Sequence, residues 1–279
     1  MSTVQSILDA VAATAPEVRG GLTGRREYQE GHNPSGEAQL AADVHADQLL
    51  EDRLLAIDGV GGYASEEREG VVTDDGAYHV ACDPLDGSSN LKSNNAMGTI
   101  VGVFDEPLPA GGDALVASAY VLYGPITTMA VAHEGTTTEY VVDDGERRAI
   151  EEALTLPEDP TVYGFGGRVP DWPEDFSNYA AEIADELKLR YGGAMIADVN
   201  QVLTYGGVFA YPGLQSRPEG KLRLQFEGLP VAHIVEAAGG ASSDGERSLL
   251  DRTPDRLHER VPVHVGNESL IDRLESTLH

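Results

Sequence analysis

The segment ACDPLDGSSN, residues 81–90, places two aspartates three residues apart. An apolar run leads to Asp83, Pro84 fixes the backbone and removes a donor, and Asp86 is expected on the turn that follows. Together with the Leu85 carbonyl, the two carboxylates would offer hard oxygen ligands to Mg²⁺, which binds one or two carboxylates and substrate phosphate. A capped turn with two solvated acids is the alternative.

The residues that follow Asp86 are suited to binding an anion. If Gly87, Ser88 and Ser89 open a helix, their N–H groups and the positive end of the helix dipole would attract phosphate. A metal ion and a phosphate group would then be neighbours.

Further acids occur in pairs elsewhere in the chain. Glu66 and Glu67 are adjacent in YASEERE, while Glu37 and Asp43 lie at the start of and inside an expected helix. In so acidic a protein, a solvated surface explains such pairs equally well. Glu227 differs because it ends an apolar and basic strand, GKLRLQFE, where a charge without a partner is costly. A metal ion is a natural partner for this carboxylate.

The chain of 279 residues has a formal net charge of −28, with acids spread along its whole length. Such a charge repels phosphate backbones and anionic lipids, so neither nucleic acid nor a membrane surface is an expected partner. Arginine supplies most of the positive charge, since only three lysines occur. The composition resembles that of halophilic proteins, with an acidic protein from a low-salt organism as the alternative.

No apolar run approaches the roughly 20 residues of a membrane helix, and the first residues lack the basic region of a signal peptide. A cytoplasmic location is therefore expected. The single cysteine, Cys82, excludes a disulfide within the chain and is expected to be buried.

The first half of the chain must position most of these acids. Helical spacing predicts a helix over 3–13 and another over about 36–56, with a long mobile loop between them. Five β-type runs then predict a largely antiparallel sheet. They cover residues 78–82, 98–104, 114–124, 127–135 and 138–145.

Helices and strands alternate after a predicted linker at 156–160, which is typical of a layered α/β lobe. The expected helices cover about 175–187, 194–204, 230–240 and 267–278, and the expected strands cover 207–211, 221–227 and 261–266. The predicted fold is an α/β layered sandwich of two lobes. Residues 1–155 would form a lobe with the antiparallel sheet and metal-binding acids, and residues 156–279 a substrate-binding lobe.

The order of motifs resembles class I fructose-1,6-bisphosphatase, within the wider superfamily of Mg²⁺-dependent, lithium-sensitive sugar and inositol phosphatases. The resemblance runs from about residue 18 to the C-terminus. It is carried by Gly-Glu at 36–37, Asp43, Ser-Glu-Glu at 65–67, Asp-Pro-Leu-Asp-Gly-Ser-Ser-Asn at 83–90, Gly-Thr-Ile at 98–100, RYGGAMIADVNQVLTYGGVFAYP at 190–212, GKLRLQFE at 220–227 and EAAGG at 236–240.

This resemblance implies two or three Mg²⁺ ions per site, with Mn²⁺ as an alternative metal. The implied ligands are Glu37, Glu66, Asp83, the Leu85 carbonyl, Asp86 and Glu227, and Glu37 stands where the family has aspartate. Glu67 and Asp43 would activate or orient the attacking water, in keeping with the need of metal-assisted hydrolysis for an activated nucleophile.

The resemblance also implies a substrate site with two ends. Asp86, Gly87, Ser88 and Ser89 would hold the 1-phosphate and its sugar. The implied residues of the distal end are Arg168, Arg190, Tyr191, Met195, Tyr211 and Lys221. For Lys221 and Arg223 the alternative is an edge-strand charge that limits aggregation, and for the two tyrosines it is core packing.

The chain departs from the family pattern in three places. Phe165-Gly166-Gly167-Arg168 replaces an Asn-Glu-Gly-Tyr segment, so Arg168 would provide a charge-assisted contact in place of a tyrosine hydroxyl. Leu91-Lys92 replaces Ile-Asp, which adds a cation near the first phosphate. The N-terminal AMP-binding segment is not found and Ala77 stands where a lysine is expected, so insensitivity to AMP is expected.

The function that follows from the resemblance is hydrolysis of fructose 1,6-bisphosphate to fructose 6-phosphate, a step of gluconeogenesis. A homodimer or homotetramer is expected, with Arg190 reaching the distal phosphate in the neighbouring subunit. Sedoheptulose 1,7-bisphosphate and inositol phosphates are alternative substrates. A phosphosugar sensor without catalysis is the alternative of another class.

Overall fold

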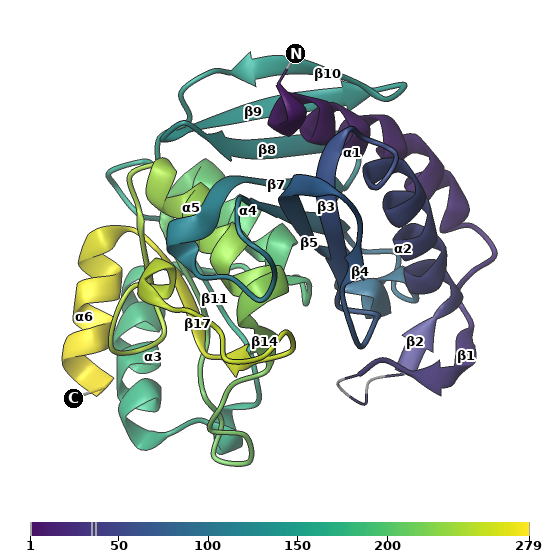
Figure 1. The fold of residues 1–279 in the computed structure, drawn as a ribbon. Helices are drawn as coiled ribbons and strands as arrows, with labels where there is room; N and C mark the ends of the chain where they lie inside the picture. Colours follow the sequence, from purple (N-terminus) through teal and green to yellow (C-terminus); the bar gives the residue numbers. More distant parts are fainter. Residues whose placement is uncertain (1, 35, 37, 279) are drawn as a thin grey trace.

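The structure is a computed structural model that describes residues 2–34, 36 and 38–278. Helices and two sheets form five alternating layers (Figure 1). The α-helices of the described residues are α1 (Thr3–Gly21), α2 (Ala41–Leu54), α3 (Glu174–Glu186), α4 (Met195–Tyr205), α5 (Leu229–Ala237) and α6 (Glu268–Leu278). Helices α1 and α2 cover the outside of the first sheet, α4 and α5 lie between the sheets, and α3 and α6 cover the second sheet. The predicted layered α/β fold is confirmed.

The first sheet has eight strands in the order β10-β9-β8-β7-β6-β5-β3-β4. Their bounds are Gly59–Ser65 (β3), Val72–Thr73 (β4), Gly76–Asp86 (β5), Met97–Phe104 (β6), Leu115–Tyr123 (β7), Thr127–His133 (β8), Thr136–Asp143 (β9) and Glu146–Glu151 (β10). The predicted antiparallel order holds from β5 to β9. Strand β10, which was not predicted, continues it, and β3 runs parallel to β5.

Strand β3 escaped prediction because its sequence, GVGGYAS, contains three glycines and little β propensity. The glycines permit a close approach between β3 and β5. A Cβ atom on Gly61 would lie 2.1 Å from the carbonyl oxygen of Gly76. The strand is therefore specified by tertiary contact more than by local propensity.

The second sheet has five strands in the order β12-β11-β13-β17-β15. Their bounds are Val162–Phe165 (β11), Lys188–Leu189 (β12), Gly207–Tyr211 (β13), Ala241–Ser243 (β15) and Val263–Gly266 (β17), and a separate pair is formed by β14 (Leu222–Arg223) and β16 (Arg260–Val261). Strands β11, β12 and β13 are parallel, and β17 is antiparallel to its neighbours.

The apolar core lies in three sections that match the layers. One section packs α1 and α2 on the first sheet, and the predicted apolar stripe of α1 is buried in it, as is Cys82. The middle section joins residues of both halves of the chain, such as Ile100 of β6 and Ile234 of α5. Both sheets therefore share one core at α4 and α5. The predicted division at residues 155 and 156 stays a prediction.

The start of the second helix was predicted wrongly. Helix α2 begins at Ala41 and not near residue 36, because the preceding segment forms β2 (Ala38–Leu40), which pairs with β1 (Tyr28–His32) inside the predicted loop. The Leu40 amide donates to Asp43 Oδ2 at 2.7 Å, so an acid of the first turn caps the helix.

The predicted strand over 221–227 is also wrong over most of its length. Only Leu222 and Arg223 pair as a strand, and a π-helical turn over Leu224–Gly228 (η4) leads into α5. The Arg223 amide donates to Glu227 Oε2 at 2.6 Å. The wide turn thus folds Glu227 back toward Arg223, an arrangement common at functional sites.

None of the helices in the described part of the chain is both long enough and apolar enough to cross a membrane.

Candidate active site

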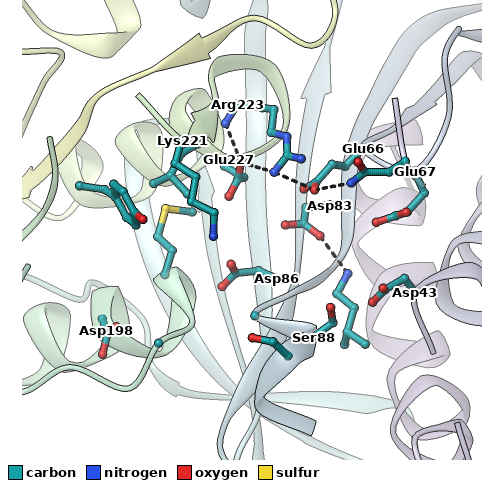
Figure 2. Close-up of a pocket in the computed structure, with 18 of the residues that line it drawn as sticks. Asp43, Glu66, Glu67, Asp83, Asp86, Ser88, Asp198, Lys221, Arg223 and Glu227 are labelled. Atoms are coloured by element: carbon teal, nitrogen blue, oxygen red, sulfur yellow. Dashed lines mark hydrogen bonds and ion pairs between the residues drawn. The ribbon is translucent and has the colours of Figure 1, made fainter. Parts of the chain in front are cut away.

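A cavity of about 390 Å³ brings residues from both halves of the chain together (Figure 2). It is lined by Asn33, Asp43, Glu66, Glu67, Asp83, Leu85, Asp86, Gly87, Ser88, Ser89, Tyr191, Gly193, Met195, Asp198, Phe209, Tyr211, Lys221, Leu222, Arg223 and Glu227. Fourteen of these residues were predicted from the sequence to belong to the site.

A β-bulge in β5 aims Asp83 and Asp86 at the same cavity. Asp83 pairs with Ile100 and Asp86 with Gly98, so two residues of β5 lie opposite one residue of β6. Residues three apart in a regular strand point to opposite faces, and the extra residue of a bulge restores the common face. Strand β5 therefore continues through Asp86, which was expected on a turn after the strand.

Glu66, Asp83 and Glu227 form the cluster best suited to a metal ion. One carboxylate oxygen from each lies within 4.8 Å of the others, and all three side chains are buried. Figure 2 shows them pointing toward one another from three separate segments. Three buried carboxylates repel one another unless a cation or protons compensate them. Their oxygen atoms fit a hard divalent cation.

The pKa shifts in this cluster have the same cause. Burial, followed by the charge of Glu66, raises the pKa of Asp83 well above its ordinary value. Burial and Glu66 likewise raise the pKa of Glu227 to about 8. Burial raises the pKa of Asp86 to about 6, although Asp86 Oδ2 accepts a hydrogen bond of 2.7 Å from the Ile196 amide. The acids are therefore held in a geometry that favours a cation.

Arg223, for which an edge-strand charge was the alternative, lines the cavity although it was not among the predicted site residues. Its Nη1 lies 2.8 Å from Glu66 Oε1 and 3.8 Å from Glu227 Oε2, and its side chain is buried. The alternating pattern of GKLRL places Arg223 on the same face of an extended segment as the predicted Lys221, and this signal could have identified Arg223. The ion pairs compensate part of the charge of the acidic cluster.

Glu67 and Asp43 lie on the opposite side of Asp83 from Lys221 (Figure 2). Burial, then the charges of Glu66 and Asp43, raise the pKa of Glu67 to about 8, while Gln39 Nε2 donates to Glu67 Oε2 at 2.5 Å. Burial raises the pKa of Asp43 to about 6. Carboxyl groups with pKa values near neutrality are suited to proton transfer.

The serine segment forms a much shorter helix than expected. Ser88–Leu91 is a 3₁₀ helix (η1) of four residues, so the contribution of a helix dipole is small. Gly87 precedes it with φ of +72°, and a Cβ atom there would lie 2.1 Å from Ala194 Cβ. The glycine therefore lets the segment pack against the beginning of α4.

Tyr191, Met195, Tyr211 and Lys221, the residues that the resemblance implies for the distal end, also line the cavity. Lys221 Nζ lies 5.9 Å from the centre of the Tyr211 ring. Tyr191 is 47% exposed, so core packing does not explain it. A cation and two aromatic side chains thus face the acidic end.

Two predicted residues of the described part of the chain do not line the cavity. Arg168 and Arg190 are exposed and do not line the cavity, and Glu37 lies outside the described residues. Asp198 and Asn33 line the cavity although neither was predicted. Asp198 could have been noticed as a charge on the buried face of α4, where burial raises its pKa to about 7.

Two family models match the chain. The model described as the fructose-1-6-bisphosphatase N-terminal domain matches residues 10–150, and the C-terminal domain model matches residues 156–279. A class 1 fructose-1,6-bisphosphatase of Natronomonas pharaonis is 67% identical over 99% of this chain and 98% of the relative. One of Halobacterium salinarum is 58% identical over 99% and 97%.

Solved structures agree with these matches. The holo form of fructose-1,6-bisphosphatase from Leishmania major superposes with a TM-score of 0.93 at 27% identity, covering 99% of this chain and 94% of that one. A putative sedoheptulose-1,7 bisphosphatase from Toxoplasma gondii gives a TM-score of 0.89 at 27% identity, covering 99% and 94%.

Proposed function

Because the chain belongs to the fructose-1,6-bisphosphatase family, we propose that it hydrolyses the 1-phosphate ester of fructose 1,6-bisphosphate to give fructose 6-phosphate. The observation that carries this proposal is the cluster of Glu66, Asp83 and Glu227 in the same cavity as the serine segment and Lys221. Such a cavity offers a metal-binding end and a cationic end to a substrate with two phosphates.

The acidic end fits Mg²⁺, for which Glu66, Asp83, Asp86, Glu227 and the Leu85 carbonyl are the proposed ligands. When bound by these residues, Mg²⁺ would supply Lewis-acid chemistry: polarisation of the phosphate ester, a lower pKa of water and compensation of charge on the leaving oxygen. Buried carboxylates with raised pKa values support this assignment, since each would be stabilised by a cation. Glu37, two or three ions per site and Mn²⁺ as a substitute stay predictions.

Glu67 and Asp43 are proposed to orient and deprotonate the attacking water. Both line the cavity beside Glu66 and can hold a proton near neutral pH. Ser88 and Ser89, with nearby backbone amides, are proposed to hold the 1-phosphate. Arg223 keeps Glu66 in place through its ion pair of 2.8 Å.

Lys221, Tyr191 and Tyr211 are proposed to bind the distal phosphate and the sugar. A chain with a net charge of −28 repels a sugar bisphosphate, so a local cation is needed where the substrate enters. Roles for Arg168 and Arg190 rest on the family resemblance. The cytoplasmic location, the homodimer or homotetramer and insensitivity to AMP also remain predictions.

Sedoheptulose 1,7-bisphosphate is the second candidate substrate, because the similar Toxoplasma gondii structure is named for it. Its sugar is one carbon longer, so discrimination would depend on the space between the acidic end and Lys221. Hydrolysis of inositol phosphates, and phosphosugar sensing without catalysis, are further functions that the sequence allows.

The proposal is tested by phosphate release from fructose 1,6-bisphosphate, sedoheptulose 1,7-bisphosphate, fructose 1-phosphate and inositol 1-phosphate, with Mg²⁺ and with a chelator. The expected result is the highest kcat/KM for fructose 1,6-bisphosphate, and loss of activity with the chelator. Asp86→Ala should lower kcat by several orders of magnitude while the protein stays folded. Preference for another substrate, or wild-type activity in Asp86→Ala, would contradict the proposal.

A further inference from the structure

The backbone amide and carbonyl groups of Gly192 are held from both halves of the chain. Its amide donates to Asp198 Oδ1 at 2.6 Å, within the second half. Its carbonyl accepts from Asn90 Nδ2 at 2.9 Å and from Asn95 Nδ2 at 3.0 Å, both in the first half. These three hydrogen bonds connect the segment after the serines to the segment that carries Tyr191.

The three side chains that bind the Gly192 backbone have further contacts of their own. Asp198 projects from α4 and is 3% exposed. Asn90 Nδ2 also donates to the Ala96 carbonyl at 2.8 Å, and Asn95 Oδ1 accepts from the Ala96 amide at 3.0 Å. Asp198 and Asn90 are therefore buried anchors, whereas Asn95 is exposed and its side chain is held by the neighbouring Ala96 amide.

The segment that they hold would otherwise be flexible. Gly192 and Gly193 are adjacent, and Gly193 has φ of +81°. Two glycines lose more conformational freedom on ordering than any other pair of residues. Tyr191 precedes the two glycines, and Gly193 lines the cavity. Backbone flexibility at the glycines would therefore let the Tyr191 side chain occupy several positions.

From these contacts we infer that Asp198 and Asn95, together with Asn90, are positioning residues that hold Tyr191 in place for substrate binding. They act through the backbone of Gly192, and no contact with the reacting phosphate is proposed for them. The inference rests on the proposed function, in which Tyr191 binds the distal part of the substrate. We call the contacts of Asp198, Asn90 and Asn95 with Gly192 the clamp. A pre-ordered tyrosine lowers the entropic cost of substrate binding, so loss of the clamp should change KM more than kcat.

Asn95→Asp is the sharpest test because it keeps the shape of the side chain but replaces the amide donor with a carboxylate that repels the Gly192 carbonyl. Asn94→Asp is the matched control. Asn94 is exposed, and its φ of +56° is a conformation that aspartate tolerates. Both variants add one negative charge at neighbouring positions, so a difference between them reports the hydrogen bond.

Two measurements are made on the full chain. The substrate is fructose 1,6-bisphosphate or the best substrate of the panel. Asn95→Asp should raise KM roughly 2- to 12-fold relative to the wild type, as expected for loss of one neutral hydrogen bond. Its kcat should stay within about twofold of the wild type. Amide hydrogen exchange of residues 188–195 should become faster in Asn95→Asp and not in Asn94→Asp.

Variants of Asp198 provide an independent test of the clamp. Asp198→Asn keeps an oxygen that can accept from the Gly192 amide and should restore most of the exchange protection and KM that Asp198→Ala loses. Equal KM and equal exchange in Asn95→Asp and Asn94→Asp would overturn the clamp. If the wild type hydrolyses no sugar phosphate, the proposed function fails, while the exchange measurement still decides whether the clamp exists.

Discussion

Glu67 is the proposed general base, and burial changes its protonation. Without a metal ion, its pKa of about 8 leaves it mostly protonated at pH 7, because burial and the charges of Glu66 and Asp43 disfavour the anion. A cation bound to the neighbouring acids would lower this pKa, since opposite charge favours the ionised form. Metal binding and formation of the proposed general base would then be coupled.

Glu67→Gln is expected to lower kcat by about 10²- to 10⁴-fold, the usual contribution of a general base. Metal affinity should fall less than in Asp86→Ala, because Glu67 is not among the proposed ligands. Steady-state rates and calorimetric Mg²⁺ titration of both variants check this. Glu69→Gln, an exposed neighbour, is the control. A Glu67→Gln variant with nearly normal kcat would remove Glu67 from the proton transfer.

The raised pKa values also predict how the stability of the metal-free protein depends on pH. Between about pH 4 and 8 the folded state retains protons on Glu67, Glu227 and Asp198 that the unfolded state has released. The contribution of these acids to stability therefore falls as pH rises through this window and levels off above it. The fall should be clearest above about pH 6.5, because His233 and His264, whose pKa values burial lowers to about 4, act in the opposite direction below it. Thermal unfolding at fixed KCl should show this decline without metal, and saturating Mg²⁺ should reduce it. A melting temperature that rises with pH over this upper range in the metal-free protein would exclude this account.

At the scale of elements, two irregularities build the metal-binding end. The bulge of β5 turns Asp83 and Asp86 to one face, and the π-helical turn after β14 returns Glu227 to Arg223. A regular strand would point Asp83 and Asp86 to opposite faces, and a regular helix would not place Glu227 in the same way. The bulge and the π-helical turn therefore determine where these carboxylates lie.

Gly87→Ala tests the junction between the serine segment and α4. The substitution combines a positive φ with a Cβ atom 2.1 Å from Ala194 Cβ, so it should cost more than the roughly 1 kcal/mol of an unfavourable φ alone and should also reduce activity. Gly135→Ala is the matched control, because its φ is +73° and nothing lies within 4 Å. Denaturant unfolding compares them. Equal loss of stability in both variants would show that the contact with Ala194 is unimportant.

For the whole molecule, charge is the dominant feature. A net charge of −28 on 279 residues produces self-repulsion that disfavours the compact state, and relatives with similar sequences come from halophiles. Among the acids whose side chains are described, the buried ones are Asp43, Asp47, Glu66, Asp83, Asp86, Asp198 and Glu227, and the others are at least partly exposed to solvent. The stability of the protein should therefore depend on salt.

The melting temperature is expected to rise with KCl and to gain most below about 1 M, where the Debye length shortens from about 10 Å at 0.1 M to about 3 Å. Scanning calorimetry over a KCl series checks this, with sucrose as an uncharged control. A melting temperature that does not change with KCl would contradict a role for charge screening.

Arg190 is predicted to act between subunits. It is exposed and does not line the cavity of its own chain. If it reaches a neighbouring subunit, Arg190→Ala should raise KM by about 10- to 150-fold, which corresponds to the roughly 1.5–3 kcal/mol of a hydrogen bond to a charged group. Mixed oligomers of Arg190→Ala and Asp86→Ala should regain activity at low substrate. A fully active monomer, or no recovery in proven mixed oligomers, would refute this role.

Local signals in the sequence determined much of this protein. Helical spacing identified α1, α3, α4 and α6, and turn residues separated the strands from β5 to β9, because these patterns depend on near neighbours. The acids of the site were also recognisable from their types and spacing, although their individual roles are still predictions.

Only the tertiary structure decided how these residues meet. Glu66 and Glu227 are far apart in sequence, and their approach depends on the register of β5, the π-helical turn and the shared core. The contact of Asn95 with Gly192 and the ion pair of Arg223 with Glu66 likewise join the two halves of the chain. No local pattern encodes such contacts, because their free energy arises from packing and pairing between segments that are distant along the chain.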